Sequence, residues 1–312
     1  MPKSESWAKD LKALLGPNLL LDAPLGALTT YRSGGNARAF VTLNSMAEIE
    51  GLASALQKVA IPELLILGNG SNLLVSDNGF NGLVVRLSDS FGEFTIGQDF
   101  CSIPGAMDLP VASRRLASLG LSGFEWAVGV PGTMGGAVKM NAGGHGSSVE
   151  ESLIQASIFD LLNSEVIMVG PPDLDFSYRH SGLTRFQIVL EAVVSVHQGD
   201  PQDCKAKLAE IVAWRRANQP GGQNSGSVFK NPSSRPAAAL IEGAGLKGLR
   251  VGRAEVSVRH ANFIQLEKGG QSKDVLAVMA TVKTRVLEAT GEVLRPEVIL
   301  VGFALEEYAV FL

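Results

Sequence analysis

Cysteine, histidine and long apolar runs are all scarce in this chain of 312 residues. Its two cysteines, Cys101 and Cys204, form no metal-binding or redox spacing, which suits a reducing compartment such as the cytoplasm. The four histidines are scattered, so we expect no metal cluster. The longest apolar run, residues 298–305, is far too short to span a bilayer.

A strong excess of charge of one sign is also missing. The formal net charge is −4 and the basic residues are dispersed, whereas nucleic-acid binders and polybasic membrane-surface proteins concentrate positive charge. Residues 1–16 mix lysines with acids and lack the apolar core of a signal peptide. We therefore expect a cytoplasmic protein that neither enters a membrane nor binds nucleic acid, although small anionic ligands need only local cations.

Hydrophobic residues are plentiful, at 46% of the chain, which predicts a large core divided between two or three packed units. Glycine is the outlier, because its 35 residues make up about 11% of the chain against a usual value of about 7%. The glycines are clustered, and the clusters are where we look for a site.

Periodicity predicts three successive parts that mix helix and strand. The first is an α/β unit, with a strand at 39–43, a helix opened by the capping box 45–48 and a strand at 64–67. The second is mainly sheet, with a helix at 109–119 and strands at 154–160, 165–169 and 188–196. A helix from residue 201 and a linker at 218–227 precede the third, with helices at 237–243 and 272–291 and strands at 254–258, 262–267 and 297–302.

Two glycine-rich segments are candidates for binding a phosphate-bearing ligand. In "GNGSNLLVSD" (68–77), missing side chains would let backbone N–H groups face a diphosphate, but taken alone the stretch is more readily an ordinary tight turn. It is neither a dinucleotide fingerprint nor a P-loop, because a strand-like run follows it and it lacks the lysine. Seven glycines predict an extended loop without regular structure at 129–146, and interleaved apolar residues argue against a flexible surface loop. Together the segments suit a dinucleotide across the junction of two units.

Three polar residues are candidates for chemistry. Arg179 in "FSYRHS" suits holding a carboxylate or stabilising negative charge, and its alternative is an exposed strand-end arginine. Glu297 in "RPEVILVG" lies either at a strand-end surface or in a cleft. Ser227 in "SGSVFKNP" lies in a loop that enters a short strand. A lone histidine such as His260 could contact a ligand, but it is not our choice for a general base.

The order and spacing of these motifs closely resemble one family. Nearly the whole chain is similar to the UDP-N-acetylenolpyruvoylglucosamine reductases, which are FAD enzymes of bacterial peptidoglycan precursor synthesis. The motifs that carry the resemblance are "YRSGG" (31–35), "GNGSNLLVSD" (68–77), "GLSGFEWAVGVPGTMGGAVKMNAG" (120–143), "YRHS" (178–181), "GSVFKNP" (226–232), "AALIEGAGLKG" (238–248), "VRHANFI" (258–264) and "PEV" (296–298). The chain resembles the shorter subtype, because it lacks the tyrosine-bearing insertion that closes the site in the longer one.

The resemblance implies an α+β fold of the vanillyl-alcohol-oxidase (PCMH) type. Two α+β subdomains would bind FAD, and a C-terminal α+β domain would bind substrate. The implied bounds are 1–87 with 298–312 for the first subdomain, 88–213 for the second and 214–297 for the substrate domain.

The resemblance also implies the chemistry. NADPH would reduce FAD, which is expected to be non-covalent because no His or Cys stands in the usual attachment context. Hydride would pass from flavin N5 to C3 of UDP-N-acetylglucosamine-enolpyruvate, giving UDP-N-acetylmuramate. Ser227 falls on the serine that protonates C2, and Arg179 and a protonated Glu297 on the residues that stabilise the enol-type intermediate. A serine is a weak acid, but the carbanion is a far stronger base, so position matters more than acidity.

Binding residues are carried over from the matching motifs. Those implied for FAD are Tyr31, Arg32, Gly34, Gly35, Gly68, Asn69, Gly70, Ser71, Asn72, Gly129, Val130, Pro131, Gly132, Gly135, Gly136, Ala137, Asn141, Ala142 and Gly143. Those implied for substrate are Tyr178, Lys230, Asn231 and His260. The chain departs from the commonest family pattern at Gly144-His145, where Ala-Tyr is usual, and at Arg295, where Glu is usual.

Two other functions compete with this one. A sugar or hydroxy-acid oxidase of the same superfamily would share both glycine-rich segments but not "GSVFKNP" or "PEV". A non-catalytic nucleotide-binding protein would keep the fold without the reaction, and the retained Ser227, Arg179 and Glu297 argue against it. No obligate protein partner is inferred.

Overall fold

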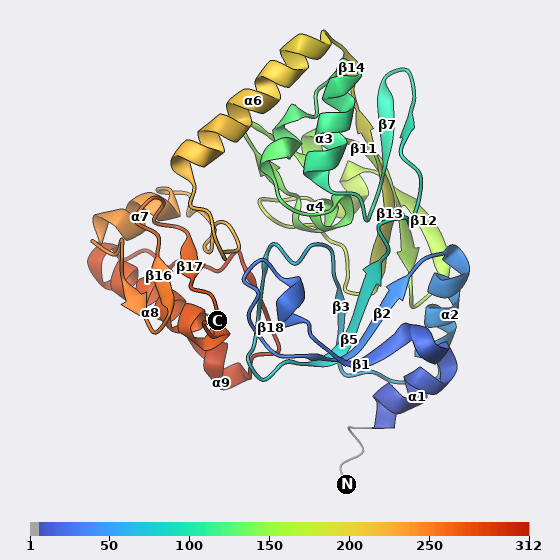
Figure 1. The fold of residues 1–312 in the computed structure, drawn as a ribbon, viewed down its shortest axis with the longest axis horizontal. Coiled ribbons are helices and arrows are strands. Elements are labelled where there is room, and N and C mark those ends of the chain that lie inside the picture. The colour runs from blue at the N-terminus through green and yellow to red at the C-terminus, as the bar shows by residue number, and fades with distance from the viewer. Residues whose placement is uncertain (1–5, 312) are drawn as a thin grey trace. The chain divides into compact units, whose positions relative to one another are not determined.

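The computed structural model describes residues 6–311, which divide into two units built from alternating segments of the chain (Figure 1). The first unit holds the chain up to Asp22, Arg38–Asn69 and Gly82–Arg215. The second holds Ala23–Ala37, Gly70–Asn81 and the chain from Arg216 onward. The three-domain division given above stays a prediction.

The first unit contains a four-stranded sheet next to two helices. Its strand order is β1 (Leu19–Ala23), β2 (Ala37–Leu43), β5 (Phe80–Leu87) and β3 (Leu64–Ile66), with β3 and β5 parallel. The helices are α1 (Ser6–Leu15) and α2 (Met46–Leu56). Ser45 caps α2 by accepting a hydrogen bond from the Glu48 N–H at 3.3 Å, as the capping motif predicts. Ile49, Leu52 and Ala53 of α2 are buried in the core of this unit.

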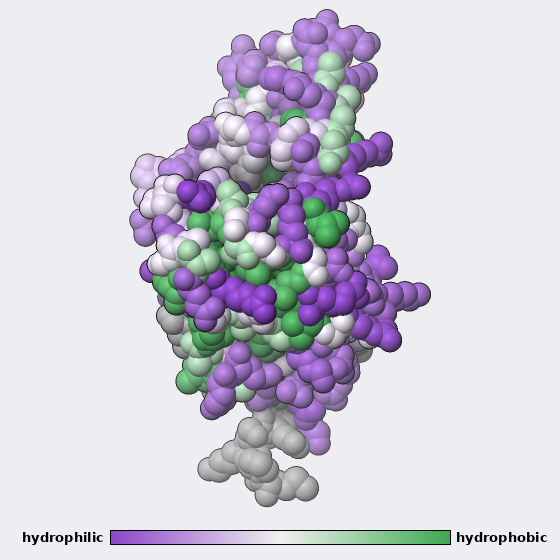
Figure 2. All heavy atoms as spheres, turned by 90° about the vertical axis from the view of Figure 1, so that its left-hand side faces the viewer, coloured by the Kyte–Doolittle hydropathy of each residue, from purple (hydrophilic) through white to green (hydrophobic). Residues whose placement is uncertain are grey.

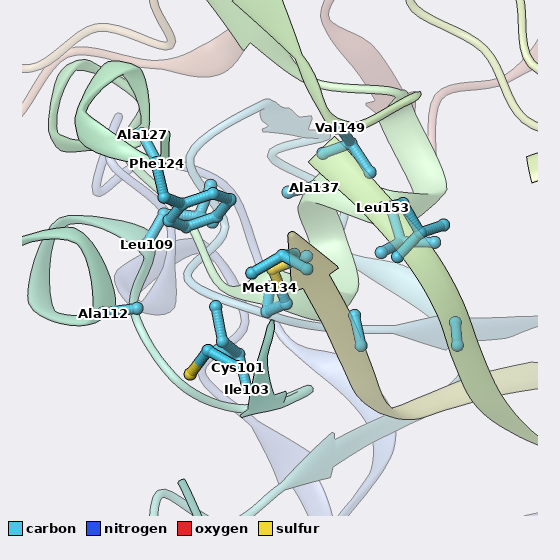
Figure 3. Packing of buried hydrophobic residues seen from close by; sticks show 14 of the residues in the cluster. Cys101, Ile103, Leu109, Ala112, Phe124, Ala127, Met134, Ala137, Val149 and Leu153 are labelled. Carbon is cyan, nitrogen blue, oxygen red and sulfur yellow. The ribbon is translucent and has the colours of Figure 1, made fainter. Parts of the chain in front are cut away.

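An antiparallel five-stranded sheet forms the rest of the first unit. Its strand order is β12 (Glu165–Val169), β11 (Leu153–Asp160), β13 (Gln187–Ser195), β7 (Phe100–Pro104) and β6 (Thr95–Ile96). The helices on it are α3 (Leu109–Ser118) and α4 (Met134–Met140), and α6 (Pro201–Asn218) follows the last strand (Figure 1). Figure 3 shows apolar side chains of α3 and α4 meeting those of the sheet in one core. The strands and the helix predicted for this part are confirmed within two residues.

The helix α4 corrects the prediction that segment 129–146 has no regular structure. Thr133 caps the helix, because its hydroxyl accepts the Gly136 N–H at 3.3 Å. Met134, Ala137 and Val138 recur at helical spacing and are buried in the core. Each helical glycine costs about 1 kcal/mol relative to alanine, and burial of this apolar face offsets that cost. The helix ends at Asn141, whose φ is 41°.

The second unit packs two helices on a small sheet. β15 (Arg250–Val251), β16 (Ala254–Val256) and β17 (Ile264–Leu266) are antiparallel, and α7 (Ala237–Gly243) and α8 (Ser272–Thr290) complete the core. A parallel pair joins β4 (Leu73–Val75) to β18 (Ile299–Val301). The side that carries α7 and α8 shows apolar residues scattered among charged ones (Figure 2). Among residues 6–311, no helix is long and apolar enough to cross a membrane.

Shorter elements connect these parts. They are β8 (Leu121–Ser122), β9 (Gly143–Gly144), β10 (Ser147–Ser148), α5 (Val149–Ser152), β14 (His197–Gln198), α9 (Leu305–Tyr308) and the 3₁₀ turns Gly16–Asn18, Gly26–Leu28, Glu125–Gly129, Pro171–Leu174 and Ala309–Phe311.

Candidate functional site

The two glycine-rich segments meet in the first unit. A Cβ added at Gly68 would lie 2.5 Å from the Thr133 hydroxyl oxygen, so this close approach requires glycine. The Asn69 side chain donates a 2.5 Å hydrogen bond to the Asp108 carboxylate, and Asp108 in turn forms a β-bridge with Thr133. Sequence reasoning missed Asp108 and Thr133. Each precedes a helix as a typical N-cap residue, which was the available signal.

The amides at the start of α4 are already used inside the protein. The Met134 N–H donates to Met107 O at 2.9 Å and the Gly135 N–H donates to Gly105 O at 2.8 Å. The Gly136 N–H is bound by Thr133. This helix terminus is therefore not a phosphate site, and any phosphate contacts in this unit must come from other groups.

What the glycine-rich segment does offer is bare backbone surface. Met134 and Ala137 point into the core (Figure 3), whereas Gly129 and Gly132 are partly exposed and Gly136 is exposed. A smooth surface without side chains fits a flat or extended cofactor such as a dinucleotide. The residues present therefore fit the predicted FAD. Individual cofactor contacts, including those of Val130, Pro131, Ala142 and Gly143, stay predictions.

The later half of the first segment lies in the second unit. Gly70 has a φ of 61°, and a Cβ there would lie 2.6 Å from the Leu28 carbonyl oxygen. The Thr30 N–H donates to Gly70 O at 3.2 Å. Protein backbone therefore occupies the space into which a side chain at Gly70 would project. The requirement for glycine at this position comes from that contact, and it is no evidence for the predicted diphosphate. The Asn72 side chain donates to Glu297 O at 3.0 Å, which ties this loop to the "PEV" motif.

The "YRSGG" motif is packed tightly in the second unit. Tyr31 is fully buried, and its hydroxyl donates to Ile264 O at 3.1 Å. Burial raises the pKa of Tyr31 to about 12. The Ser33 hydroxyl donates to Gly270 O at 3.0 Å and the Gly35 N–H to Ser76 O at 2.8 Å. These contacts give the motif a structural role, and the cofactor roles of Tyr31, Arg32, Gly34 and Gly35 stay predictions.

Arg179 lies at the tip of a tight turn in the first unit. Ser177 and His180 form an isolated antiparallel bridge, with both N–H groups donating to the opposite carbonyl at 3.1 Å. Arg179 has a φ of 56°, and its guanidinium donates to Gly143 O at 2.9 Å. Its charge also lies 5.1 Å from the ring centre of Tyr178, which is exposed. This partly buried arginine is therefore held in place, in contrast to the alternative of a free strand-end side chain.

Backbone pairing brings Ser227 and Glu297 close together in the second unit. Phe229 and Pro296 form an antiparallel bridge, and the Glu297 N–H donates to Val228 O at 2.8 Å. Ser227 directly precedes Val228, so the serine and the glutamate lie at neighbouring positions of the paired segments. Both are partly buried, so each combines a fixed backbone with access to solvent. Arg179 belongs to the other unit, so the meeting of all three side chains stays a prediction.

Asn262 holds the extended segment that follows Ser227, which the structure forms as an isolated bridge at Phe229 and not as the predicted short strand. Its side-chain oxygen accepts the Phe229 N–H at 3.0 Å and its amide donates to Phe229 O at 2.8 Å. The Lys230 N–H donates to Arg295 O at 2.9 Å. This bond uses the main chain of Arg295. The arginine side chain, which stands where the family pattern has glutamate, therefore leaves the pairing of residues 228–230 with 295–297 intact. Asn262 therefore supports the candidate site, although no feature of the sequence distinguishes it from its neighbours in this role.

Two of the residues predicted to bind substrate, Asn231 and His260, make contacts within the protein. The Asn231 side-chain oxygen accepts the Ala237 N–H at 3.0 Å, so this residue also supports the start of α7. His260 packs edge-on against Phe263, with ring centres 4.7 Å apart. Burial is the main cause that lowers the pKa of His260. No contact tests the substrate roles of Tyr178, Lys230, Asn231 and His260, which stay predictions.

His145 replaces the aromatic residue that is usual beside the glycine-rich segment. Its ring lies edge-on to Trp214 with centres 5.3 Å apart. A Cβ at Gly129 would lie 2.6 Å from the same imidazole, so His145 covers that glycine. Burial, followed by the charge of Arg215, lowers the pKa of His145. The histidine therefore packs as an aromatic ring against Trp214, and its surroundings disfavour protonation.

Comparison with known proteins decides between the candidate functions. A curated UDP-N-acetylenolpyruvoylglucosamine reductase of Synechococcus sp. (strain RCC307) is 41% identical over 291 residues, which cover 91% of this chain and 94% of that protein. A second, from Rubrobacter xylanophilus, is 40% identical and covers 92% of this chain and 97% of that protein. This chain belongs to the UDP-N-acetylenolpyruvoylglucosamine reductase family.

Domain and structure comparisons agree with membership of this reductase family. Residues 218–301 match the family described as UDP-N-acetylenolpyruvoylglucosamine reductase, C-terminal domain, and residues 37–167 match an FAD binding domain. The crystal structure of the reductase from Thermus caldophilus is 32% identical, with a TM-score of 0.78 and coverage of 91% of this chain and 98% of that chain. The predicted family, the α+β flavoprotein fold and the FAD cofactor are confirmed. Ser227 and Glu297 both lie within the matched C-terminal domain.

Proposed function

We propose that this FAD-dependent reductase converts UDP-N-acetylglucosamine-enolpyruvate to UDP-N-acetylmuramate with NADPH as reductant. The observation that carries the proposal is family membership along nearly the whole chain, together with the pairing that places Ser227 beside Glu297. The peptidoglycan precursor made in this way would supply cell-wall growth. Because NADPH and nucleotide sugars are cytoplasmic metabolites, the cytoplasm is the proposed compartment.

FAD is proposed to lie against the bare backbone surface of the first unit. Gly129, Gly132 and Gly136 would border it, with Gly68 and Asn69 beside them. Bound FAD supplies the chemistry that no side chain offers, which is to accept a hydride from NADPH and deliver it to the substrate. Gly132 and Gly136 contribute by leaving the approach open, whereas the His145 ring already covers Gly129.

Three side chains, Ser227, Arg179 and Glu297, are proposed to act on the substrate through their positions and charges. Ser227 gives its hydroxyl proton to the substrate carbon that bears the carboxylate, after the neighbouring carbon has received hydride. The Arg179 guanidinium stabilises the negative charge that develops there, and Glu297 donates a hydrogen bond from its protonated form. The main-chain pairing at Val228 limits how far Ser227 can move from Glu297. That restriction is useful, because a proton donor must lie within hydrogen-bond reach of its acceptor.

Anaerobic spectroscopy of the purified protein tests this function. We expect a yellow protein whose flavin absorbance is bleached by NADPH and restored by the enolpyruvyl nucleotide sugar, but not by UDP-N-acetylglucosamine. Acid precipitation should release the flavin into the supernatant, because it is not covalently attached. Flavin that is bleached by NADPH and restored only by oxygen would indicate an oxidase. A colourless protein that still binds the nucleotide sugar would support the non-catalytic alternative.

A further inference from the structure

The turn that carries Arg179 is strained. A positive φ at the third residue of a four-residue turn is typical of type II turns, in which glycine or asparagine normally occupies this position. Here Arg179 occupies it, with a φ of 56°. A bulky side chain persists in this conformation only where surrounding contacts hold it there, and such sites are often functional.

Asn141 supplies a contact that holds this turn. It is 5% exposed, and its side-chain amide donates to Ser177 O and to the Glu150 carboxylate, both at 3.1 Å. Its side-chain oxygen accepts the Glu150 N–H at 3.1 Å. Both amide hydrogens are therefore used inside the protein. The bond to Ser177 O reaches the first residue of the Arg179 turn.

The residues around Asn141 bind the rest of the same turn. The Lys139 carbonyl accepts the Ser181 hydroxyl at 2.8 Å, and the Lys139 ammonium donates to Leu183 O. The Arg179 guanidinium donates to Gly143 O at 2.9 Å. The end of α4 thus contacts the turn before, at and after Arg179, and Asn141 is the buried centre of this set.

We propose that Asn141 is a positioning residue for Arg179, in addition to any role beside the cofactor. It anchors Ser177 so that the strained turn persists and the guanidinium keeps one direction. Loss of the anchor would let Arg179 relax to a negative φ, which would move its charge away from the position that the substrate requires. This inference rests on the proposed catalytic role of Arg179.

The test uses Asn141→Gly. Glycine adopts the φ of 41° at this position without strain, so the end of α4 is kept while all three side-chain hydrogen bonds are lost. Ser164→Gly is the matched control, because Ser164 is an exposed residue with a φ of 55° in the turn between β11 and β12. Ser164→Gly should match the unchanged protein in flavin content and in both half-reactions, and the rates of Asn141→Gly are compared per bound flavin. Reoxidation by the enolpyruvyl substrate should fall about 10- to 10²-fold in Asn141→Gly alone.

Hydrogen exchange gives a readout that does not depend on turnover. The Ser177 and His180 amides, which close the turn, should exchange faster in Asn141→Gly than in the unchanged protein or in Ser164→Gly. If Asn141→Gly does not fold, Asn141→Asp combined with Glu150→Gln replaces it, because aspartate keeps the acceptor for the main-chain N–H of residue 150 and loses the bond to Ser177 O, while glutamine removes the second carboxylate. The same selective slowing of reoxidation is expected. Equal slowing of both half-reactions, or unchanged exchange at the turn, overturns the proposal.

A double-mutant cycle separates this inference from the proposed function. In an Arg179→Ala background, adding Asn141→Gly should slow reoxidation no further, because the residue to be positioned is gone. Additive losses overturn the positioning role and leave the function intact. If Arg179→Ala alone leaves reoxidation unchanged, the catalytic role of Arg179 is wrong, and the positioning role is overturned with it.

Discussion

At the scale of single residues, Ser227 is the side chain whose chemistry can be isolated most cleanly. It is needed only after hydride has reached the substrate, so the two half-reactions should respond differently to its removal. Ser227→Ala should leave NADPH-dependent bleaching near normal and slow reoxidation by the substrate by about 10²–10⁴-fold, as is usual for loss of a positioned acid. Stopped-flow traces of each half-reaction provide the measurement.

Two further variants complete this prediction. Ser227→Cys keeps an ionisable proton at nearly the same place and should recover part of the rate. Ser233→Ala, an exposed serine in the same segment, should behave as the unchanged protein. Equal slowing of both half-reactions by Ser227→Ala would show that the serine only shapes its loop.

At the scale of elements, α8 depends on a cap from a distant part of the chain. Ser272 is the first helical residue, and the preceding Gln271 makes no side-chain cap. Asp77 takes that role, accepting the Ser272 N–H at 2.9 Å and the Lys273 N–H at 3.0 Å with its two carboxylate oxygens. A carboxylate at this end also interacts favourably with the helix dipole.

Removal of that cap should therefore weaken the second unit. Asp77→Ala is expected to lower the free energy of unfolding by about 1–2 kcal/mol, measured by urea denaturation. Asp77→Asn keeps one acceptor oxygen without the charge. Its free energy of unfolding should lie between those of Asp77→Ala and the unchanged protein. An Asp77→Ala protein with the stability of the unchanged chain would mean that water satisfies the helix terminus equally well.

At the scale of the whole molecule, two histidines with lowered pKa values, the partly buried His260 and the more exposed His145, couple stability to pH. Burial lowers the pKa values of His145 and His260 from the ordinary value of 6.5, so the folded protein binds their protons less readily than the unfolded chain. Their contribution to stability is complete above pH 6.5 and is lost as pH falls from there through the lowered folded pKa values.

The melting temperature should thus decline on acidification below about pH 6.5. His145→Phe, which keeps an aromatic ring against Trp214, should make the decline shallower, and adding His260→Phe should flatten it further. Thermal melts between about pH 5 and 7.5 supply the measurement. Identical pH profiles in the variants and the unchanged protein would assign the acid sensitivity to carboxylates instead.

The sequence by itself determined the types and order of most elements, because these depend on contacts between near neighbours. The spacing of Ile49, Leu52 and Ala53 specifies one face of α2, and Ser45 specifies its start. The motifs also determined the family and its cofactor. Glycine density alone misled at α4, where the buried Met134 face outweighed the helix cost of its glycines.

Only the tertiary structure decided which distant residues cooperate. The cap that Asp77 places on Ser272 spans 195 residues, and the bond from Asn141 to Ser177 spans 36. The pairing that brings Glu297 beside Ser227 also joins separate parts of the chain. Such contacts leave no periodic signal, because each depends on where the intervening chain returns in space and on which backbone groups remain to be satisfied there.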